Sequence, residues 1–265
     1  MCLLVLAWRT HPRCSLVVAA NRDEYHDRPA AALAPWAGSA AILAGRDLRA
    51  GGAWLGIDAR RRFGVITNFR DPVRAPAGAP SRGALVPGFL GRSAGAGEYL
   101  AAVAGEAGNY GGFNLLLADG ESLWYASNRG TPFARPLPPG IYGLANERLD
   151  TPWPKLRRVR QGFESWLRTG SPEDGGLFAL LEDRRPAASA EQPLSSTGPA
   201  AAWERAMSAP FVLNERYGTR CSTIVAVEPT GGCYLAERRF DASGARSGES
   251  EYRLAPEEWP RLPPA

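Results

Sequence analysis

The chain has almost no lysine, very little histidine and no long apolar run. Lys155 is its one lysine among 31 basic residues, and His11 and His26 are its only histidines. Two histidines are too few for a metal centre built from histidine. The densest basic runs, 60–62 and 157–160, are isolated, whereas nucleic-acid binding requires a basic stripe interleaved with aromatic residues. We therefore expect no nucleic-acid partner, and the net charge of +4 says little about other partners.

No segment approaches the roughly 18 apolar residues that a membrane-spanning helix needs. The apolar start has no basic region before it and is too short for a secretory signal. We therefore expect a cytoplasmic protein with no transmembrane segment, in which cysteines stay reduced. The cysteines, at positions 2, 14, 221 and 233, include no C-x-x-C spacing, which argues against a zinc site or a dithiol motif. No metal and no required cofactor are expected.

Short strand-like runs dominate the chain, and most come in pairs around turn residues. The 265 residues, 45% of them hydrophobic, suffice for a large core, and no sharp boundary divides them. We therefore expect a single domain over residues 1–265. The predicted strand pairs are 3–8 with 15–20, 53–57 with 63–68, 113–118 with 123–127, and 223–227 with 233–240, and 141–145 is a further short strand.

Helical patterns lie between these hairpins. The strongest covers 153–169, where Leu156, Val159 and Phe163 recur with helical spacing. Shorter helices are predicted at 84–90, 98–104 and 177–181, and 185–199 is predicted as a surface loop. Hairpins throughout, with helices grouped between them, favour an α+β fold of two antiparallel sheets faced with helices.

The most informative chemical feature is the start, Met1-Cys2. Loss of Met1 would leave Cys2 with a free α-amine beside its own thiol. An α-amine titrates at about pH 7.7–8.0, so near neutral pH much of it can act as a base. N-terminal-nucleophile hydrolases use such a residue, in which the nucleophile carries its own general base. The same two residues are also compatible with an ordinary strand start.

Polar clusters flank the predicted strands, where a sheet can deliver side chains to a common site. They lie at 21–24 (Asn-Arg-Asp-Glu), 67–70, 145–148 and 218–223. Asn and Asp at strand ends also make ordinary turn hydrogen bonds, so each cluster alone is ambiguous. Because side chains alternate along a strand, Asn21 and Asp23 share one face and Arg22 and Glu24 the other.

Together these clusters and their neighbours resemble the NRDE family, also called the transport and Golgi organisation family. The matching blocks are 1–2, 21–24 with 28–29, 44–48, 51–56, 67–70, 81–83, 112–116, 142–144 with Asn146, 149–155 and 217–220, in order over about residues 1–240. That family is similar to N-terminal-nucleophile hydrolases of the choloylglycine hydrolase and penicillin V acylase type. The resemblance implies a four-layer αββα sandwich of two antiparallel sheets and cleavage of a linear amide bond.

The resemblance also implies roles for individual residues. Cys2 would be the nucleophile and, through its amine, the base, and Asp23 would orient that amine. Asn68 and Asn146 would donate hydrogen bonds to the oxyanion. Arg220 would polarise the nucleophile or bind an anionic group.

One position departs from the related enzymes. They have an arginine where this chain has Ala20, and the sequence does not show which residue replaces it. Arg22 is the nearest candidate, but it lies on the opposite face of the strand from Asp23.

The family is also associated with intracellular haem trafficking and lipid homeostasis, which need a binding cleft and no turnover. On this alternative the cleft holds haem or an acyl lipid, and arginines bind propionates or phosphates. The ligand-binding residues would be Asn21, Arg22, Arg46 and Trp54, with Arg220, Trp36 and Tyr142 as further contacts and His11, His26 or Cys2 as iron ligands. A scaffold without a ligand is a third hypothesis, which the polar clusters disfavour.

Overall fold

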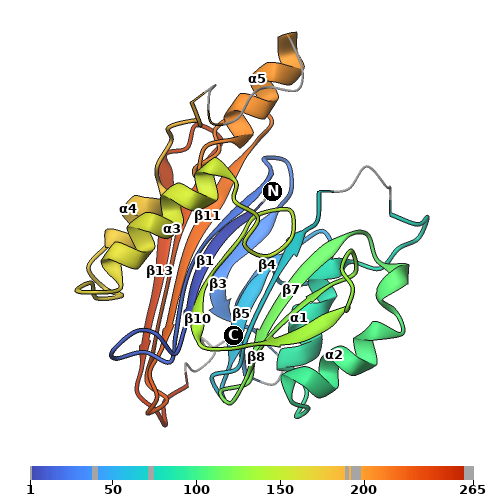
Figure 1. The fold of residues 1–265 in the computed structure, drawn as a ribbon, viewed down its shortest axis with the longest axis vertical. Helices are drawn as coiled ribbons and strands as arrows, with labels where there is room; N and C mark the ends of the chain where they lie inside the picture. Colours follow the sequence, from blue (N-terminus) through green and yellow to red (C-terminus); the bar gives the residue numbers. More distant parts are fainter. Residues whose placement is uncertain (1, 38–40, 71–74, 189–190, 192–197, 260–265) are drawn as a thin grey trace.

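The computed structural model describes residues 2–37, 41–70, 75–188, 191 and 198–259, which form two antiparallel sheets with helices on their outer faces (Figure 1). The first sheet has the spatial order β10 (Gly140–Leu144), β1 (Cys2–Trp8), β2 (Leu16–Tyr25), β11 (Tyr217–Val227), β12 (Cys233–Phe240) and β13 (Arg246–Leu254). The second has the order β3 (Ala30–Pro35), β4 (Ile42–Asp47), β5 (Leu55–Asp58), β6 (Phe63–Asn68), β7 (Phe113–Ala118), β8 (Leu123–Ser127) and β9 (Ala134–Leu137). The chain thus leaves the first sheet after β2, builds the second in one run and returns at β10.

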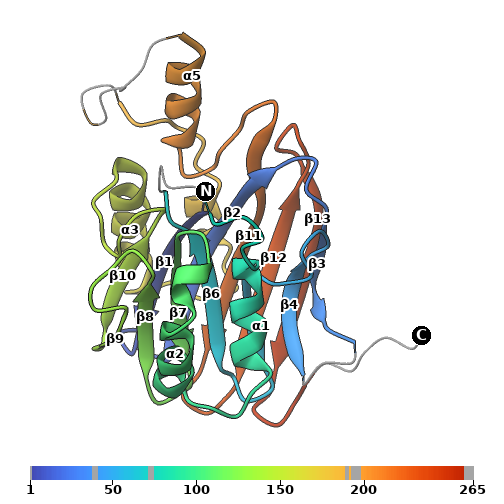
Figure 2. The ribbon, with the colours of Figure 1, turned by 90° about the vertical axis from the view of Figure 1, so that its right-hand side faces the viewer.

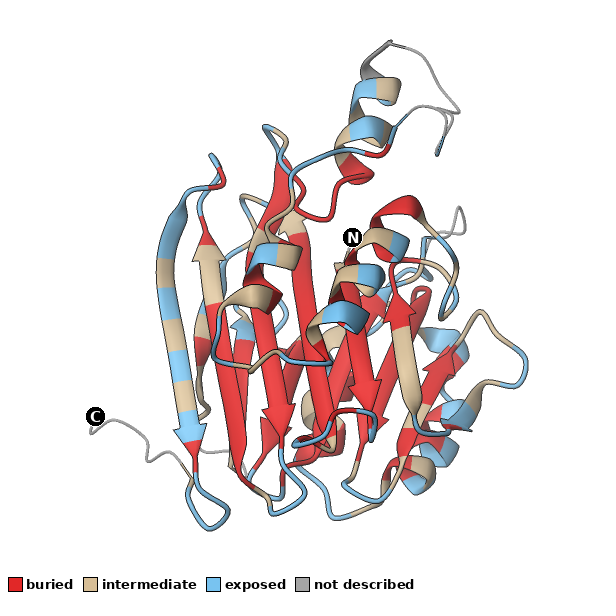
Figure 3. Cartoon of the chain, turned by 60° about the vertical axis from the view of Figure 1, so that its left-hand side comes forward, coloured by how far each residue is buried: buried red, intermediate tan, exposed pale blue. Residues whose placement is uncertain are grey.

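Strand β1 shows why the layers stack. Leu4 and Leu6 lie on one face of the strand, in the core between the two sheets. Leu3 and Val5 lie on the other face, in a second core beneath the helices. Both faces of the central strands are therefore covered, and these strands are buried along most of their length (Figure 3). An apolar run without polar alternation is the sequence consequence of a strand buried on both faces.

Helices complete the two outer layers (Figure 2). Helices α3 (Pro154–Trp166) and α4 (Gly176–Leu181) pack on the first sheet, and α1 (Leu85–Leu90) and α2 (Ala96–Ala104) pack on the second. The remaining helical elements are the 3-10 turns η1 (Arg82–Ala84) and η2 (Ala107–Asn109) and the helix α5 (Gly198–Met207), which projects beyond the end of the sheets. This order of layers confirms the expected αββα sandwich. Within the described residues, no helix is both long and apolar enough to cross a bilayer.

Most of the predicted hairpins and helices are confirmed, with ends that differ by a few residues. The strands β3, β4, β9 and β13 and the helix α5 were not predicted. Three of these strands, β3, β9 and β13, lie at sheet edges. An edge strand pairs on one side only and needs little apolar sequence, so it leaves a weak signal. Most of the loop predicted at 185–199 lies outside the described residues, and α5 begins at Gly198 within that range.

The 21–24 cluster lies at the carboxyl end of a strand, as predicted, but that strand is longer than the predicted 15–20. Strand β2 continues to Tyr25, and β11 begins at Tyr217, well before the predicted start at residue 223. The two polar segments pair with each other in antiparallel register, so their backbone groups are satisfied inside the sheet. The cluster is therefore part of a rigid, buried strand.

A substitution at Phe163 of α3 tests whether this helix packs on the first sheet. The Phe163 ring is fully buried against the first sheet. We expect Phe163→Ala to lower the free energy of unfolding by about 3–5 kcal/mol, because the residual cavity adds to the lost transfer energy. Urea denaturation measures this. Gln161→Ala, on the exposed side of the same helix, should change stability by less than about 0.5 kcal/mol, and equal losses would contradict the layer assignment.

Candidate functional site

Cys2 is the first residue of β1 and lies at one end of the space between the sheets. It pairs with Arg22 of β2, and paired residues of an antiparallel ladder project to the same face. Both residues line a cavity of about 110 Å³, together with Trp54, Asn68 and Arg82. The thiol therefore opens toward a small cavity whose walls come from both sheets.

Asn146 holds the main-chain nitrogen of Cys2. The Cys2 N–H donates to Asn146 Oδ1 at 3.0 Å, and Asn146 Nδ2 donates to the carbonyl oxygen of Asn68 at 2.8 Å. The backbone N–H of Arg70 donates to the Asn146 carbonyl oxygen at 2.6 Å. Asn146 thus ties the first residue of β1 to the end of β6. Loss of Met1 would turn the held nitrogen into an α-amine beside the same acceptor.

The environment of the Cys2 thiol has opposing effects on its pKa. Burial raises the pKa of the Cys2 thiol, and the Asp23 carboxylate raises it too. A hydrogen bond from the backbone N–H of Asp23 and the guanidinium of Arg22 lower it. The unaided thiol is therefore protonated at neutral pH, and an attack on substrate requires a base that removes its proton.

Asp23 lies on the other face of β2, on the side of the sheet that the helices cover. Its side chain is buried, and the hydroxyl of Thr219 donates to Oδ1 at 2.7 Å. The Tyr217 hydroxyl donates to its carbonyl oxygen at 2.6 Å. Burial raises the pKa of Asp23, whereas the N-terminal amine, Lys155, the Thr219 hydroxyl and Arg22 lower it. The face alternation expected from the sequence is confirmed, because Asp23 faces the helices and Arg22 faces the cavity.

Lys155 was missed as a site residue. It lies in the first turn of α3, is only 5% exposed, and its Nζ has no hydrogen-bond partner among the described residues. Burial lowers the pKa of Lys155, whereas Asp23 and Cys2 raise it and Arg70 lowers it. The amino-acid composition could have identified it, because Lys155 is the single lysine of an arginine-rich chain and belongs to the matching block 149–155.

Arg22 is a buried guanidinium at the cavity wall. It lies 4.5 Å from the ring centroid of Trp54, and its Nη2 donates to Asp47 Oδ2 at a long 3.4 Å. The same carboxylate oxygen accepts a shorter 2.6 Å bond from Arg28 Nε. The other terminal nitrogen, Nη1, is buried and has no hydrogen-bond partner in the described part of the chain. Arg22 therefore has binding capacity that the protein itself does not use.

Gly45 allows this arrangement. A Cβ at that position would lie 2.2 Å from atoms of the Trp54 ring. The missing side chain leaves room for the indole ring of Trp54, over which Arg22 lies.

The structure does not bring three of the predicted residues to this cavity. Arg220 lies at a bulge of β11, and its Nη1 donates to the carbonyl oxygens of Tyr25 and His26 at 2.9 and 3.1 Å. Arg46 is exposed and stacks on Trp36. Asn21 faces α4, where its amide joins protein groups only. Cys2, Arg22, Trp54 and Asn68 line the cavity, Asp23 borders it with Oδ1 bound to Thr219, and Asn146 contacts Cys2.

The residues named as haem contacts do not fit that ligand. The cavity of about 110 Å³ is smaller than the about 300–1,000 Å³ typical of ligand pockets. His11 lies in the loop at the opposite end of the β1–β2 hairpin from Cys2. His26 Nε2 lies 2.9 Å from the carbonyl oxygen of Asn214. Nor do the described residues contain a group of three or more His, Cys, Asp or Glu that could hold a metal ion.

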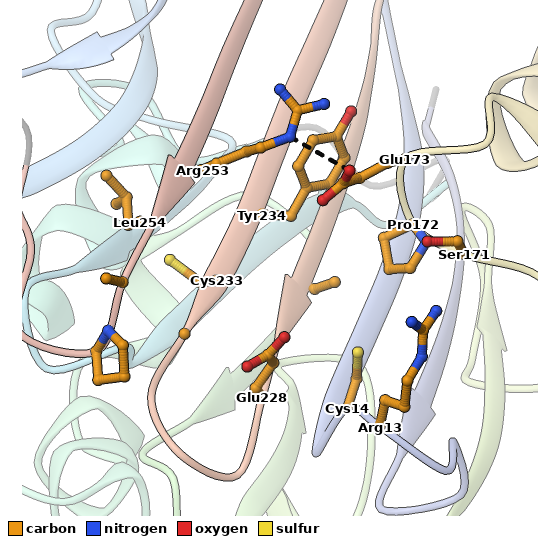
Figure 4. Close-up of a pocket in the computed structure, with 14 residues that line it drawn as sticks. Arg13, Cys14, Ser171, Pro172, Glu173, Glu228, Cys233, Tyr234, Arg253 and Leu254 are labelled. Carbon is orange, nitrogen blue, oxygen red and sulfur yellow. Dashed lines mark ion pairs between the residues drawn. The ribbon is translucent and has the colours of Figure 1, made fainter.

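A larger cavity of about 340 Å³ lies beside the first sheet, and Cys14 and Cys233 are among the residues that line it (Figure 4). Burial raises the pKa of each thiol to about 11, so neither is a nucleophile at neutral pH. Arg253 and Glu173 form an ion pair there at 3.3 Å, and both side chains are about half exposed. None of the buried, unpartnered polar atoms in the described chain lines this cavity. The smaller cavity at Cys2 is therefore the better candidate.

Comparison with known proteins gives one family. The family model described as Transport and Golgi organisation 2 matches residues 1–242. A Transport and Golgi organization 2 homolog from Mus musculus is 34% identical over 275 residues, which cover 96% of this chain and 99% of that protein. The Homo sapiens Transport and Golgi organization protein 2 homolog is 34% identical over 265 residues, which cover 90% and 92%.

Two solved structures are similar at low sequence identity. A Caenorhabditis elegans N-acylethanolamine-hydrolyzing acid amidase ortholog is 10% identical, with a TM-score of 0.48 and coverage of 86% of this chain and 92% of that chain. Penicillin V acylase from Agrobacterium tumefaciens is 12% identical, with a TM-score of 0.39 and coverage of 89% and 82%.

Asn21 provides a test of which cluster residues are structural. Its Nδ2 donates to the carbonyl oxygens of Leu181 and Pro210 at 2.9 and 3.0 Å, and its Oδ1 accepts from Ser222 at 2.6 Å. We expect Asn21→Leu to lower the free energy of unfolding by about 2–4 kcal/mol, because it leaves buried groups unpaired. Thermal and urea unfolding measure this. The exposed Asn109→Leu is the control, and an Asn21 variant of unchanged stability would contradict the structural role.

Proposed function

This chain belongs to the Transport and Golgi organisation 2 family, as its sequence blocks predicted, and from that premise we propose that it is a cysteine amidohydrolase. Cys2, freed by removal of Met1, would cleave a linear amide bond. One observation carries the proposal: the nitrogen of Cys2 is held at 3.0 Å by Asn146 Oδ1 while its thiol opens to a cavity. That geometry keeps a future α-amine next to the thiol that it would deprotonate.

The proposed reaction has two steps. The α-amine of Cys2 accepts the thiol proton as the sulfur attacks the amide carbon, and then gives that proton to the leaving amine as the C–N bond breaks. A water molecule, deprotonated by the same amine, hydrolyses the thioester and frees the acid. Because burial raises the pKa of the thiol, the amine has to act as base during the attack.

Asn68 is the proposed oxyanion donor. It lines the cavity, whereas the amide of Asn146 is already engaged by Cys2 and by the Asn68 carbonyl. Asn146 then serves to orient the amine, and the donor role falls to the side chain of Asn68. One pre-aimed donor is worth about 3–4 kcal/mol of transition-state stabilisation.

Arg22 is the proposed anchor for a negatively charged part of the substrate. Its unpartnered Nη1 and its seat on Trp54 leave the guanidinium ready to bind a carboxylate. Arg22, Arg28 and Arg82 face Glu24 and Asp47 around the cavity, so a group with a single negative charge is accommodated best.

A cytoplasmic location is part of the proposal. All four cysteines are free thiols, the state that a reducing compartment maintains.

A non-enzymatic ligand carrier is the second candidate, with the same cavity as its site. The observation that favours it is the raised pKa of the Cys2 thiol, which makes the sulfur a poor nucleophile when Met1 is retained. On this proposal an acyl ligand would bind without turnover, whereas haem would require the cavity to widen well beyond its about 110 Å³. A saturable shift of the haemin Soret band on titration of the protein would support a haem role, and its absence would count against it.

The nucleophile is tested with untagged protein and a panel of neutral and carboxylate-bearing N-acyl amides. Intact-mass spectrometry should show loss of Met1 and, after brief incubation, an acyl adduct that hydroxylamine removes. We expect Cys2→Ser to reduce turnover by about 10³-fold or more, since it removes the nucleophile. Cys14→Ser is the matched control, because Cys14 is a buried thiol at the far end of the same hairpin. Retained Met1, or full activity of Cys2→Ser, would refute the hydrolase and favour the carrier.

The anchor is tested by comparing paired substrates that differ only in a carboxylate. We expect Arg22→Met to raise KM for the carboxylate-bearing amide by about 10- to 100-fold relative to the neutral amide, from the ~1.5–3 kcal/mol of a charged hydrogen bond. The ratio of the two KM values is used because an effect of Arg22 on the Cys2 thiol changes both substrates equally and cancels. Arg46→Met, an exposed arginine outside the cavity, is the control. An equal loss on both substrates would show that Arg22 acts on Cys2 alone.

A further inference from the structure

Lys155 is a buried charge that the proposed reaction does not yet use. Its side chain is 5% exposed, and its Nζ has no hydrogen-bond partner among the described residues. A buried ammonium group without a partner is costly, and in a chain that otherwise uses arginine it is the one lysine. A side chain that only filled this space would be apolar.

Helix α3 does not account for the charge either. Pro154 and Lys155 are the first two residues of the helix. The amino-terminal end of a helix carries partial positive charge, which disfavours a cation there. The charge of the ammonium group therefore has to be stabilised by a group outside its own helix.

The groups that act on Lys155 come from the start of the first sheet and the end of β6. Asp23 of β2 and Cys2 of β1 favour its charged form, and Arg70, which follows β6, disfavours it. Asp23 faces the helix layer, where Thr219 donates to one of its oxygens. Of these groups, Asp23 is the carboxylate. It is buried and acts on Lys155 through space, with no direct hydrogen bond to Nζ.

We propose that Lys155 is a positioning residue of the Cys2 centre, whose ammonium group keeps the buried Asp23 ionised from the helix side of the sheet. The ionised Asp23 then orients the α-amine of processed Cys2. The second step rests on the proposed hydrolase function, whereas the coupling of Lys155 with Asp23 does not.

The single lysine makes this coupling directly measurable. Full-length protein labelled with ¹³C,¹⁵N-lysine should give one side-chain signal, which reports the ionisation of Lys155 without assignment. We expect that signal to titrate below the pH of a free lysine, because burial disfavours the charged form. Asp23→Asn should move the titration to still lower pH, since the carboxylate that favours the ammonium is gone. Glu24→Gln is the matched control, one residue away on the opposite face of β2, and should leave the signal unchanged.

A signal that Asp23→Asn does not move, or that both variants move equally, would overturn the proposal. A second measurement needs no change at Asp23. In Lys155→Met, the folded-state pKa of Asp23 should rise further above its unfolded value, so the variant should lose stability relative to wild type as pH rises through that folded-state pKa. The comparison is made at pH values below the range in which the Lys155 signal titrates, since Lys155 itself contributes a pH dependence above it. A stability difference that is constant with pH over that lower range in urea unfolding would also overturn the proposal.

Activity separates this inference from the proposed function. If the protein hydrolyses amides, the acid limb of the pH–rate profile should move to higher pH in Lys155→Met, because Asp23 holds its proton longer, and Lys155→Arg should restore part of the wild-type profile. Coupling in the lysine spectrum without any turnover would support the pair and reject the hydrolase. Turnover without coupling in the lysine spectrum would support the hydrolase and reject the coupling of Lys155 with Asp23.

Discussion

The pairing of β1 between β2 and β10 is the constraint on which the rest of the site depends. Leu4 pairs with Ala20 on one side and with Leu144 on the other, so the strand cannot slide without breaking two ladders. Chain ends usually fray. Here the residue at position 2 is held by the ladder to β2 and by Asn146, two residues beyond the end of β10. The position of the thiol thus follows from the sheet.

Burial then decides the electrostatics around that thiol. It raises the pKa of the Cys2 thiol and of Asp23, and it lowers the pKa of Lys155, so each charged form depends on a partner. The sheet separates the two cations that serve as partners. Arg22 lies on the cavity side with Cys2, whereas Lys155 lies on the helix side with Asp23. On the proposed hydrolase function, the cavity face of the sheet would bind substrate and the helix face would set the protonation state of the Cys2 centre.

The sequence predicted the central elements well and the edges poorly. Apolar runs such as 3–8 and 113–118 are buried on both faces, and their length alone marks them as strands. Edge strands such as β13 carry a polar pattern, because only one neighbour pairs with them. The polar ends of β2 and β11 were missed for a related reason, since each is stabilised by the other strand, almost two hundred residues away along the chain.

From the sequence alone came the family, the nucleophile candidate and the face alternation that places Asp23 opposite Arg22, because these depend on local order and on the two-residue period of a strand. Tertiary structure decided the rest. It placed Arg22 and Trp54 beside Cys2, left Arg46 and Arg220 outside the cavity and buried Lys155 within electrostatic reach of Asp23. The contact between Cys2 and Asn146 joins residues 144 positions apart, and no local pattern encodes it. Such contacts follow from how two sheets and their helices pack, because packing alone determines which polar groups share a buried space.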